Sequence, residues 1–226
     1  LAYKEKGELG QAIDSFTLAA KYKTNDIDMH YELGLAYSNN NSFDKAIKEY
    51  ELVQGYRPNQ ADIYNNLGYA YEKVGLIDEA INTYEKAIKI KTDYASAYNN
   101  LGNAFLKKHE IDKAIASYKS AIESKHKYVD AYNNLGKAYY VKGYRKTPIK
   151  MFELALQYKP DYAEAYNNLG ILYFEKNQVS LSIELFKLAL KYAPNYAEAF
   201  FNLGCAYKVT QADDKVIENF EAAISN

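Results

Sequence analysis

The chain has 226 residues, a formal net charge of -1 and 48% hydrophobic residues. This composition is typical of one or two folded domains, and the balanced charge argues against nucleic acid or an anionic membrane as a partner. No apolar run approaches the roughly 20 residues that a membrane-spanning helix needs. The single cysteine, Cys205, excludes an internal disulfide, which fits a reducing compartment. We therefore expect a cytoplasmic protein with neither nucleic-acid nor membrane partners.

A Leu-Gly pair recurs at a fixed interval of 34 residues along the chain. Its glycines are Gly34, Gly68, Gly102, Gly136, Gly170 and Gly204. With glycine as the eighth position, the chain contains a partial repeat at 1–26, full repeats at 27–60, 61–94, 95–128, 129–162 and 163–196, and a nearly complete last repeat at 197–226. We expect a single array over 1–226 that is cut at both ends, so that the native N-terminus is absent.

Each repeat is expected to form two helices. In 61–94, Tyr64, Leu67 and Tyr71 follow helical spacing, and a second apolar set runs from Ala80. Gly75, between the two sets, is expected to end the first helix, and Asp78 to cap the second. The residues expected to cap in the other repeats are Asp44, Asp112, Ser180 and Asp214. A lone hairpin cannot bury both apolar faces, so neighbouring repeats must stack.

The fourth repeat departs from this pattern at "YRKTPIK". Lys146 replaces the capping acid and Pro148 replaces an alanine. We expect Thr147 to cap the helix with Pro148 at its first position, where a missing N–H does no harm. The alternative interpretation is a phosphorylation site at Thr147, because Thr-Pro follows two basic residues.

The repeat resembles the tetratricopeptide repeat, whose pattern is an aromatic residue, Leu-Gly, an aromatic residue, Ala, an aromatic residue, Ala and Pro. In 61–94 these places hold Tyr64, Leu67-Gly68, Tyr71, Ala80, Tyr84, Ala87 and, in place of proline, Thr92. Proline is kept as Pro58, Pro160 and Pro194. The resemblance implies an all-α solenoid, a right-handed superhelix of antiparallel helix pairs with a concave groove.

Paired asparagines recur in the words "YNNLG" at 64–68, 98–102, 132–136 and 166–170. The resemblance implies that they line the groove. One row would contain Asn66, Asn100, Asn134, Asn168 and Asn202, and a second row beside it Asn65, Asn99, Asn133 and Asn167. Tyr69, Asn103 and Lys137 are expected on the same surface. Because an amide both donates and accepts, such rows can pair with the backbone of an extended peptide. Alternatively, the asparagines cap helices, link neighbouring first helices or reflect compositional bias.

Charged residues recur on the same helices. An acidic rim would contain Asp28, Asp62, Asp130, Glu164 and Glu198, and a basic side Lys73, Lys107, Lys137 and Lys208. This arrangement favours a partner with some basic residues. The alternative is that these residues are ordinary solvated helix ends.

Catalytic residues, a metal site and a cofactor are not expected. His30, His109 and His126 occupy unrelated registers, and Cys205 has no histidine in its surroundings. The favoured function is a non-catalytic scaffold that binds an extended segment of a partner protein in its groove. One alternative is the substrate-recognition segment of a larger enzyme, since the asparagines look similar to those of O-linked N-acetylglucosamine transferases. Another is a structural subunit of an assembly, or self-association through the repeat ends.

Overall fold

The computed structural model describes residues 9–22 and 26–226, and every regular element in these ranges is an α-helix. The helices form two compact units, Leu1–Lys125 and His126–Asn226. The predicted partial repeat at 1–26 lies partly outside the described residues. The expectation of one array over the whole chain stays a prediction.

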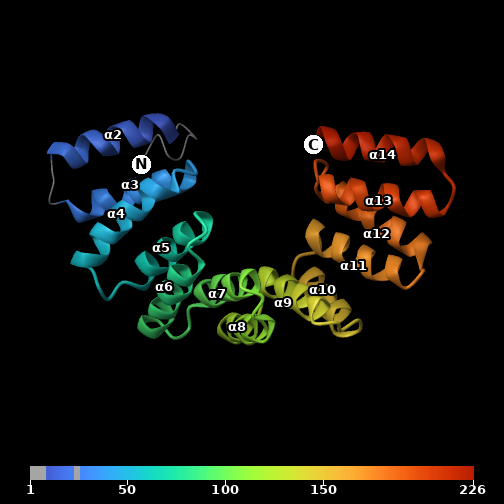
Figure 1. Cartoon of the computed structure of the whole chain (residues 1–226), viewed down its shortest axis with the longest axis horizontal. Helices are drawn as coiled ribbons and strands as arrows, with labels where there is room; N and C mark the ends of the chain where they lie inside the picture. The colour runs from blue at the N-terminus through green and yellow to red at the C-terminus, as the bar shows by residue number, and fades with distance from the viewer. Residues whose placement is uncertain (1–8, 23–25) are drawn as a thin grey trace. The chain divides into compact units, whose positions relative to one another are not determined.

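Unit 1 is a stack of antiparallel helices in chain order (Figure 1). Its helices are α2 (Leu9–Tyr22), α3 (Ile27–Asn39), α4 (Phe43–Tyr56), α5 (Ala61–Lys73), α6 (Ile77–Ile90), α7 (Ala95–Lys107) and α8 (Ile111–Ser124). Each helix packs against the next one, and α5 also touches α3 and α7. The first helices of consecutive repeats are therefore neighbours, and this contact carries the asparagines.

Unit 2 repeats the arrangement with α9 (Val129–Val141), α10 (Thr147–Tyr158), α11 (Ala163–Glu175), α12 (Val179–Tyr192), α13 (Ala197–Val209) and α14 (Asp213–Ser225). The first helix of each repeat, which is odd-numbered from α3 to α13, begins at the first residue of the 34-residue period. Here α11 touches both α9 and α13.

Each first helix ends in a left-handed residue. Gly75 has a φ of 88°, its N–H bonds to the Glu72 carbonyl, and the next N–H, of Leu76, bonds to the Tyr71 carbonyl. This is a Schellman C-cap, and it confirms that Gly75 ends the helix. The equivalent residues with positive φ are Asn41, His109, Gly143, Asn177 and Gln211. A glycine is therefore used in only two of these six turns.

The expected caps of the second helices are wrong. Helix α6 begins at Ile77, its N-cap is Leu76, and Asp78 lies inside the first turn without a capping hydrogen bond. Asp44, Asp112, Ser180 and Asp214 are likewise second helical residues. The helix starts earlier because the Leu76 carbonyl already accepts the Ala80 N–H at 3.0 Å. An acidic residue there still interacts favourably with the helix dipole.

In α10, Thr147 is the first helical residue and Lys146 the N-cap. The expected capping by Thr147 is therefore wrong. Pro148 lies in the first turn, where a helix tolerates it, and its side chain is buried.

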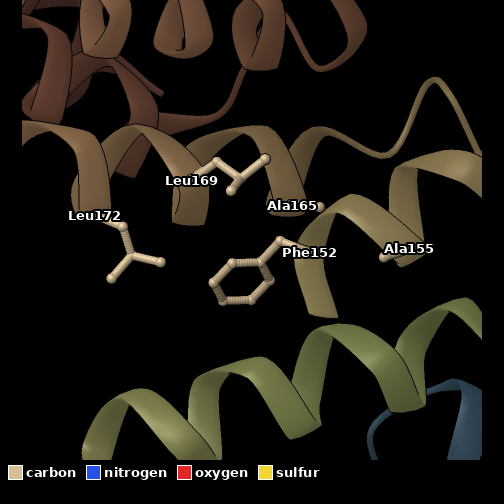
Figure 2. Packing of buried hydrophobic residues seen from close by; sticks show 5 residues of the cluster. All are labelled: Phe152, Ala155, Ala165, Leu169 and Leu172. Carbon is tan, nitrogen blue, oxygen red and sulfur yellow. The ribbon is translucent and has the colours of Figure 1, made fainter. Parts of the chain in front are cut away.

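The core of each repeat is an aromatic ring pressed against the first-helix glycine. A Cβ added to Gly102 would lie 2.5 Å from Cε1 of Tyr118, and one added to Gly170 would lie 2.5 Å from Cε1 of Phe186. Figure 2 shows such a ring in unit 2, where Phe152 and Ala155 of α10 pack with Ala165, Leu169 and Leu172 of α11. The helices of a pair can approach this closely only because glycine has no side chain.

Candidate functional site

One asparagine row lies beneath the surface. Asn99 is 6% exposed, and Asn133 and Asn167 are 0% exposed. The expectation that this row lies on the surface beside the other is therefore wrong for these three residues. Asn65 is half-buried. The Asn133 and Asn167 side chains lie in the contact between consecutive first helices instead of facing solvent.

The buried row links neighbouring repeats through hydrogen bonds. Asn133 donates to Glu164 at 3.1 Å and accepts from Asn168 at 2.9 Å. One repeat later, Asn167 donates to Glu198 at 3.0 Å and accepts from Asn202 at 2.9 Å. In unit 1, Asn65 accepts from Asn100 at 3.1 Å. The alternative that asparagines link first helices is confirmed for these residues. Each bond satisfies an amide that would be costly to bury alone.

The other row, which we call the outer amide row, reaches the surface of the first helices. It contains Asn66, Asn100, Asn168 and Asn202, all half-buried. Each amide nitrogen donates one bond to the preceding repeat, and the Asn66 bond goes to the Tyr31 hydroxyl at 2.9 Å. Their carbonyl oxygens accept no hydrogen bond from the described residues. Asn134, at the same register of α9, is also half-buried.

The acidic rim belongs to the same network. Tyr94 donates to Asp62 at 2.6 Å, and Tyr162 donates to Asp130 at 2.9 Å and to Glu164 at 3.4 Å. Burial and then the charges of these two carboxylates raise the pKa of Tyr162. Sequence reasoning missed these tyrosines. The available signal was a tyrosine placed 32 residues after each acid, at 62 and 94 and at 130 and 162.

Asp28 is paired differently, with the Arg57 guanidinium at 2.8 Å. The hydrogen bond and charge of Arg57 lower the pKa of the Asp28 carboxyl. The expected acidic rim is thus largely bonded within the protein, by hydroxyls, amides and one arginine.

Three further predicted residues have separate surroundings. Tyr69 is 38% exposed and packs edge-on against Phe43, with ring centroids 6.0 Å apart. Asn103 accepts a hydrogen bond from Tyr118 at 2.7 Å. Lys137 is exposed on α9. Of these, Tyr69 and Lys137 are open to a ligand, whereas the Asn103 oxygen is already used.

In unit 1, a second-helix tyrosine forms a hydrogen bond with a charged side chain of the first helix. Tyr84 donates to Glu72 at 3.1 Å, and Lys107 lies 2.8 Å from the other oxygen of that carboxylate. In unit 2, Tyr140 donates to Glu175, and Nε of Arg145 lies 3.2 Å from Glu175. The Glu72–Lys107 and Tyr140–Glu175 contacts join consecutive repeats, whereas the Tyr84–Glu72 bond lies within one repeat.

Among the described residues, no three His, Cys, Asp or Glu side chains lie together in a way that could hold a metal ion. His30 bonds instead to Glu49 at 2.7 Å. None of the helices described is both long and apolar enough to cross a membrane.

Comparison with known proteins gives a consistent family. Models of the TPR repeat match residues 75–109 and 102–143, and models of the tetratricopeptide repeat match 27–60, 129–162 and 163–196. No curated protein sequence matches significantly.

Among solved structures, MamA is 31% identical, with 74% of this chain and 97% of MamA covered and a TM-score of 0.63. A tetratricopeptide repeat protein from Parabacteroides merdae is 16% identical, with 99% of this chain and 89% of that chain covered and a TM-score of 0.81. YrrB, described as a TPR protein with an unusual peptide-binding site, is 20% identical, with coverages of 78% and 91% and a TM-score of 0.57. The last two likenesses concern the fold. The chain belongs to the tetratricopeptide repeat family, and the predicted all-α solenoid of antiparallel helix pairs is confirmed.

Proposed function

We propose that this chain is a non-catalytic scaffold that binds an extended segment of a partner protein along its first helices. The family supports a role in protein–protein interaction, and the extended conformation is our further step. The observation that carries it is the outer amide row, in which Asn66, Asn100, Asn168 and Asn202 keep an unbonded carbonyl oxygen at the surface.

An amide held by one bond still offers an acceptor oxygen and a second N–H. These two groups match the N–H and C=O of a peptide backbone, which alternate along an extended chain. Recognition through backbone groups would tolerate many partner sequences. Specificity would come from neighbouring side chains, such as Tyr69 in unit 1 and Lys137 in unit 2.

The buried row supports this function indirectly. Asn133 holds the Asn168 amide at 2.9 Å, and Asn167 holds the Asn202 amide at 2.9 Å. A side chain fixed before binding loses less conformational entropy when a ligand arrives. We therefore assign Asn65, Asn99, Asn133 and Asn167 to positioning and the outer amide row to partner contact.

A second candidate function, a structural subunit of an assembly, is favoured by one apolar surface. Phe201, Phe220 and Ile224 line a cavity of about 590 Å³ on α13 and α14, and Ile224 is 87% exposed. A structural neighbour, the hetero-tetramer Cut9-Hcn1, is itself a complex, at 18% identity. Self-association through this surface is part of that proposal. The substrate-recognition segment of a larger enzyme would use the same outer amide row as the scaffold does.

The experiment compares capture of partners by the wild type and by a variant with Asn66, Asn100, Asn168 and Asn202 all changed to Ala. The matched control changes Asn82 and Gln157 to Ala, because both are exposed amides on second helices. Circular dichroism first establishes that all three proteins fold.

Partners that bind the wild type and the control but not the quadruple variant would support the scaffold function. Equal capture by all three proteins would contradict it. Partners lost instead after Phe201→Ser would favour the assembly role.

A further inference from the structure

The Tyr50 hydroxyl is buried without a hydrogen-bond partner. Tyr50 is 0% exposed, and among the described residues its oxygen is the one buried side-chain polar atom that forms no hydrogen bond. Burial raises the pKa of the Tyr50 phenol, and the polar Ser38 side chain nearby opposes that shift. A buried polar group that is left unsatisfied destabilises the fold, so the unpartnered Tyr50 hydroxyl calls for an explanation.

The tyrosines at the equivalent positions in the next two repeats of unit 1 each have a hydrogen-bond acceptor. Tyr84, 34 residues later, donates to the Glu72 carboxylate at 3.1 Å, and the Lys107 ammonium lies 2.8 Å from the same carboxylate. Tyr118 donates to the amide oxygen of Asn103 at 2.7 Å. An acceptor oxygen at the surface of the first helix therefore meets the hydroxyl in both later repeats of this unit.

The first repeat lacks that acceptor but keeps the cation. Ser38 stands at the position of Glu72, and Lys73 stands at the position of Lys107. Lys73 is exposed and lies 5.1 Å from the ring centroid of Tyr69, and it forms no ion pair in the described part of the chain. The hydroxyl and the ammonium that hold Glu72 thus have counterparts in the first repeat, while the carboxylate between them is missing.

We propose that the surface between α3 and α5 binds one carboxylate side chain of the partner, an aspartate or glutamate, between the Tyr50 hydroxyl and the Lys73 ammonium. The inference rests on the proposed scaffold function and names one side chain of the bound segment. The partner carboxylate takes the place that Glu72 has in the next repeat.

The local side chains fit a single negative charge. Leu35, half-buried, packs against the cluster that contains Tyr50, and Ser38 is shorter than the glutamate at its position in the next repeat. Glu32, six residues earlier in α3, adds negative potential to the Tyr50 hydroxyl. This potential repels every anion and repels a dianion more strongly, so the Lys73 ammonium can offset it more readily for a carboxylate than for a phosphate.

The first probe is sodium acetate. Its binding is monitored by nuclear magnetic resonance at pH 7 and compared with the effect of sodium chloride at equal ionic strength. We expect saturable shifts at Tyr50 and Lys73 with acetate and not with chloride. A second pair of probes is the blocked peptide Gly-Ser-Glu-Ser-Gly and its glutamine version, and we expect the glutamate peptide to bind about tenfold more tightly. Equal responses to acetate and chloride, or to the two peptides, would overturn the proposal.

The decisive variant is Ser38→Glu, which restores the arrangement of the next repeat. Its own carboxylate should raise the melting temperature and abolish the acetate response. Tyr50→Phe should leave the protein folded, because no hydrogen bond is lost, and should weaken the response. An unchanged acetate response in both variants would refute the site.

The same variants separate this inference from the scaffold function. If Asn66→Ala and Asn100→Ala abolish partner binding while Ser38→Glu leaves it intact, the scaffold function stands and the carboxylate site is wrong. If the acetate response is present but the asparagine variants bind every partner normally, the site exists and the scaffold function fails.

Discussion

The two units differ in the aromatic residue that packs against the first-helix glycine. It is tyrosine in unit 1 and phenylalanine in unit 2, a difference of one oxygen atom per repeat. In unit 1 the aromatic ring belongs to Tyr50, Tyr84 or Tyr118, and in unit 2 to Phe152, Phe186 or Phe220. The packing slot is the same, since an added Cβ would lie 2.5–2.7 Å from the Cε1 atom in every repeat. The close approach of the two helices is therefore independent of the hydroxyl.

A buried tyrosine hydroxyl needs a hydrogen-bond acceptor on the first helix that packs against it. Tyr84 and Tyr118 are matched by the acceptors Glu72 and Asn103. In unit 2, where the rings have no hydroxyl, the positions equivalent to Glu72 hold Tyr140, Phe174 and Lys208. The comparison teaches that the glycine and the ring set the helix packing in both units, whereas each tyrosine hydroxyl adds a need for an acceptor, which Glu72 and Asn103 meet and the first repeat lacks.

The largest expected effect is at the glycine, in both units alike. Gly102→Ala and Gly170→Ala should each destabilise the protein by about 3 kcal/mol, because the new Cβ would meet a buried ring that cannot move without disturbing the core. Urea unfolding followed by circular dichroism measures both. Tolerance of alanine in one unit would break the claim that the slot is shared.

The next effect is at the buried asparagine row. Asn167→Ala should cost about 2–3 kcal/mol, because it removes a fully buried side chain together with its two hydrogen bonds to Glu198 and Asn202. Asn66→Ala, from the outer amide row, is the control and should cost about 1 kcal/mol, because its one bond goes to the half-buried Tyr31 hydroxyl. Equal urea midpoints for the two variants would contradict the division into a positioning row and a surface row.

Exchanging the ring type between units should have a smaller effect. Phe186→Tyr places a hydroxyl where Phe174 stands above it, and we expect a cost of about 2 kcal/mol. Tyr84→Phe should cost about 1 kcal/mol through the lost bond to Glu72. Tyr50→Phe should be neutral or slightly stabilising, because it removes a buried hydroxyl that has no hydrogen-bond partner. Unfolding midpoints that ranked these three variants in the opposite order would break the comparison.

The smallest effect is the pH dependence of stability. Burial raises the pKa of Tyr84 and Tyr118 in the folded protein, whereas an unfolded tyrosine ionises near pH 10. The contribution of each buried tyrosine to the free energy of unfolding is therefore complete well below pH 10. It falls as the pH rises, by about 0.4 kcal/mol per tyrosine at pH 10. Urea midpoints at pH 8 and pH 10 test this, and the Tyr84→Phe/Tyr118→Phe variant should lose less stability between them. An equal loss would assign the effect to other groups.

The repeat gave more of the fold than of the site. The 34-residue period located the start of every first helix, because Leu67 and Gly68 and their equivalents are dictated by close helix packing. The second-helix caps were misjudged by one or two residues, since the Leu76 carbonyl, not the Asp78 side chain, starts α6.

The burial of Asn133 and Asn167 was not visible from one repeat. It depends on the next repeat, which supplies Glu164 and Glu198 to receive the amides. The signal was present as an acidic residue 31 positions after each asparagine. Helical faces within a single hairpin cannot reveal a contact that forms only between hairpins, and this is why the two rows looked equivalent.

The most direct test of the central claim, that the outer amide row binds the partner, is to measure affinity in one unit at a time. The captured partner is titrated against the wild type, Asn66→Ala/Asn100→Ala in unit 1 and Asn168→Ala/Asn202→Ala in unit 2. The account predicts that at least one pair weakens binding by about tenfold or more while both variants stay folded. Wild-type affinity in both pairs would contradict it.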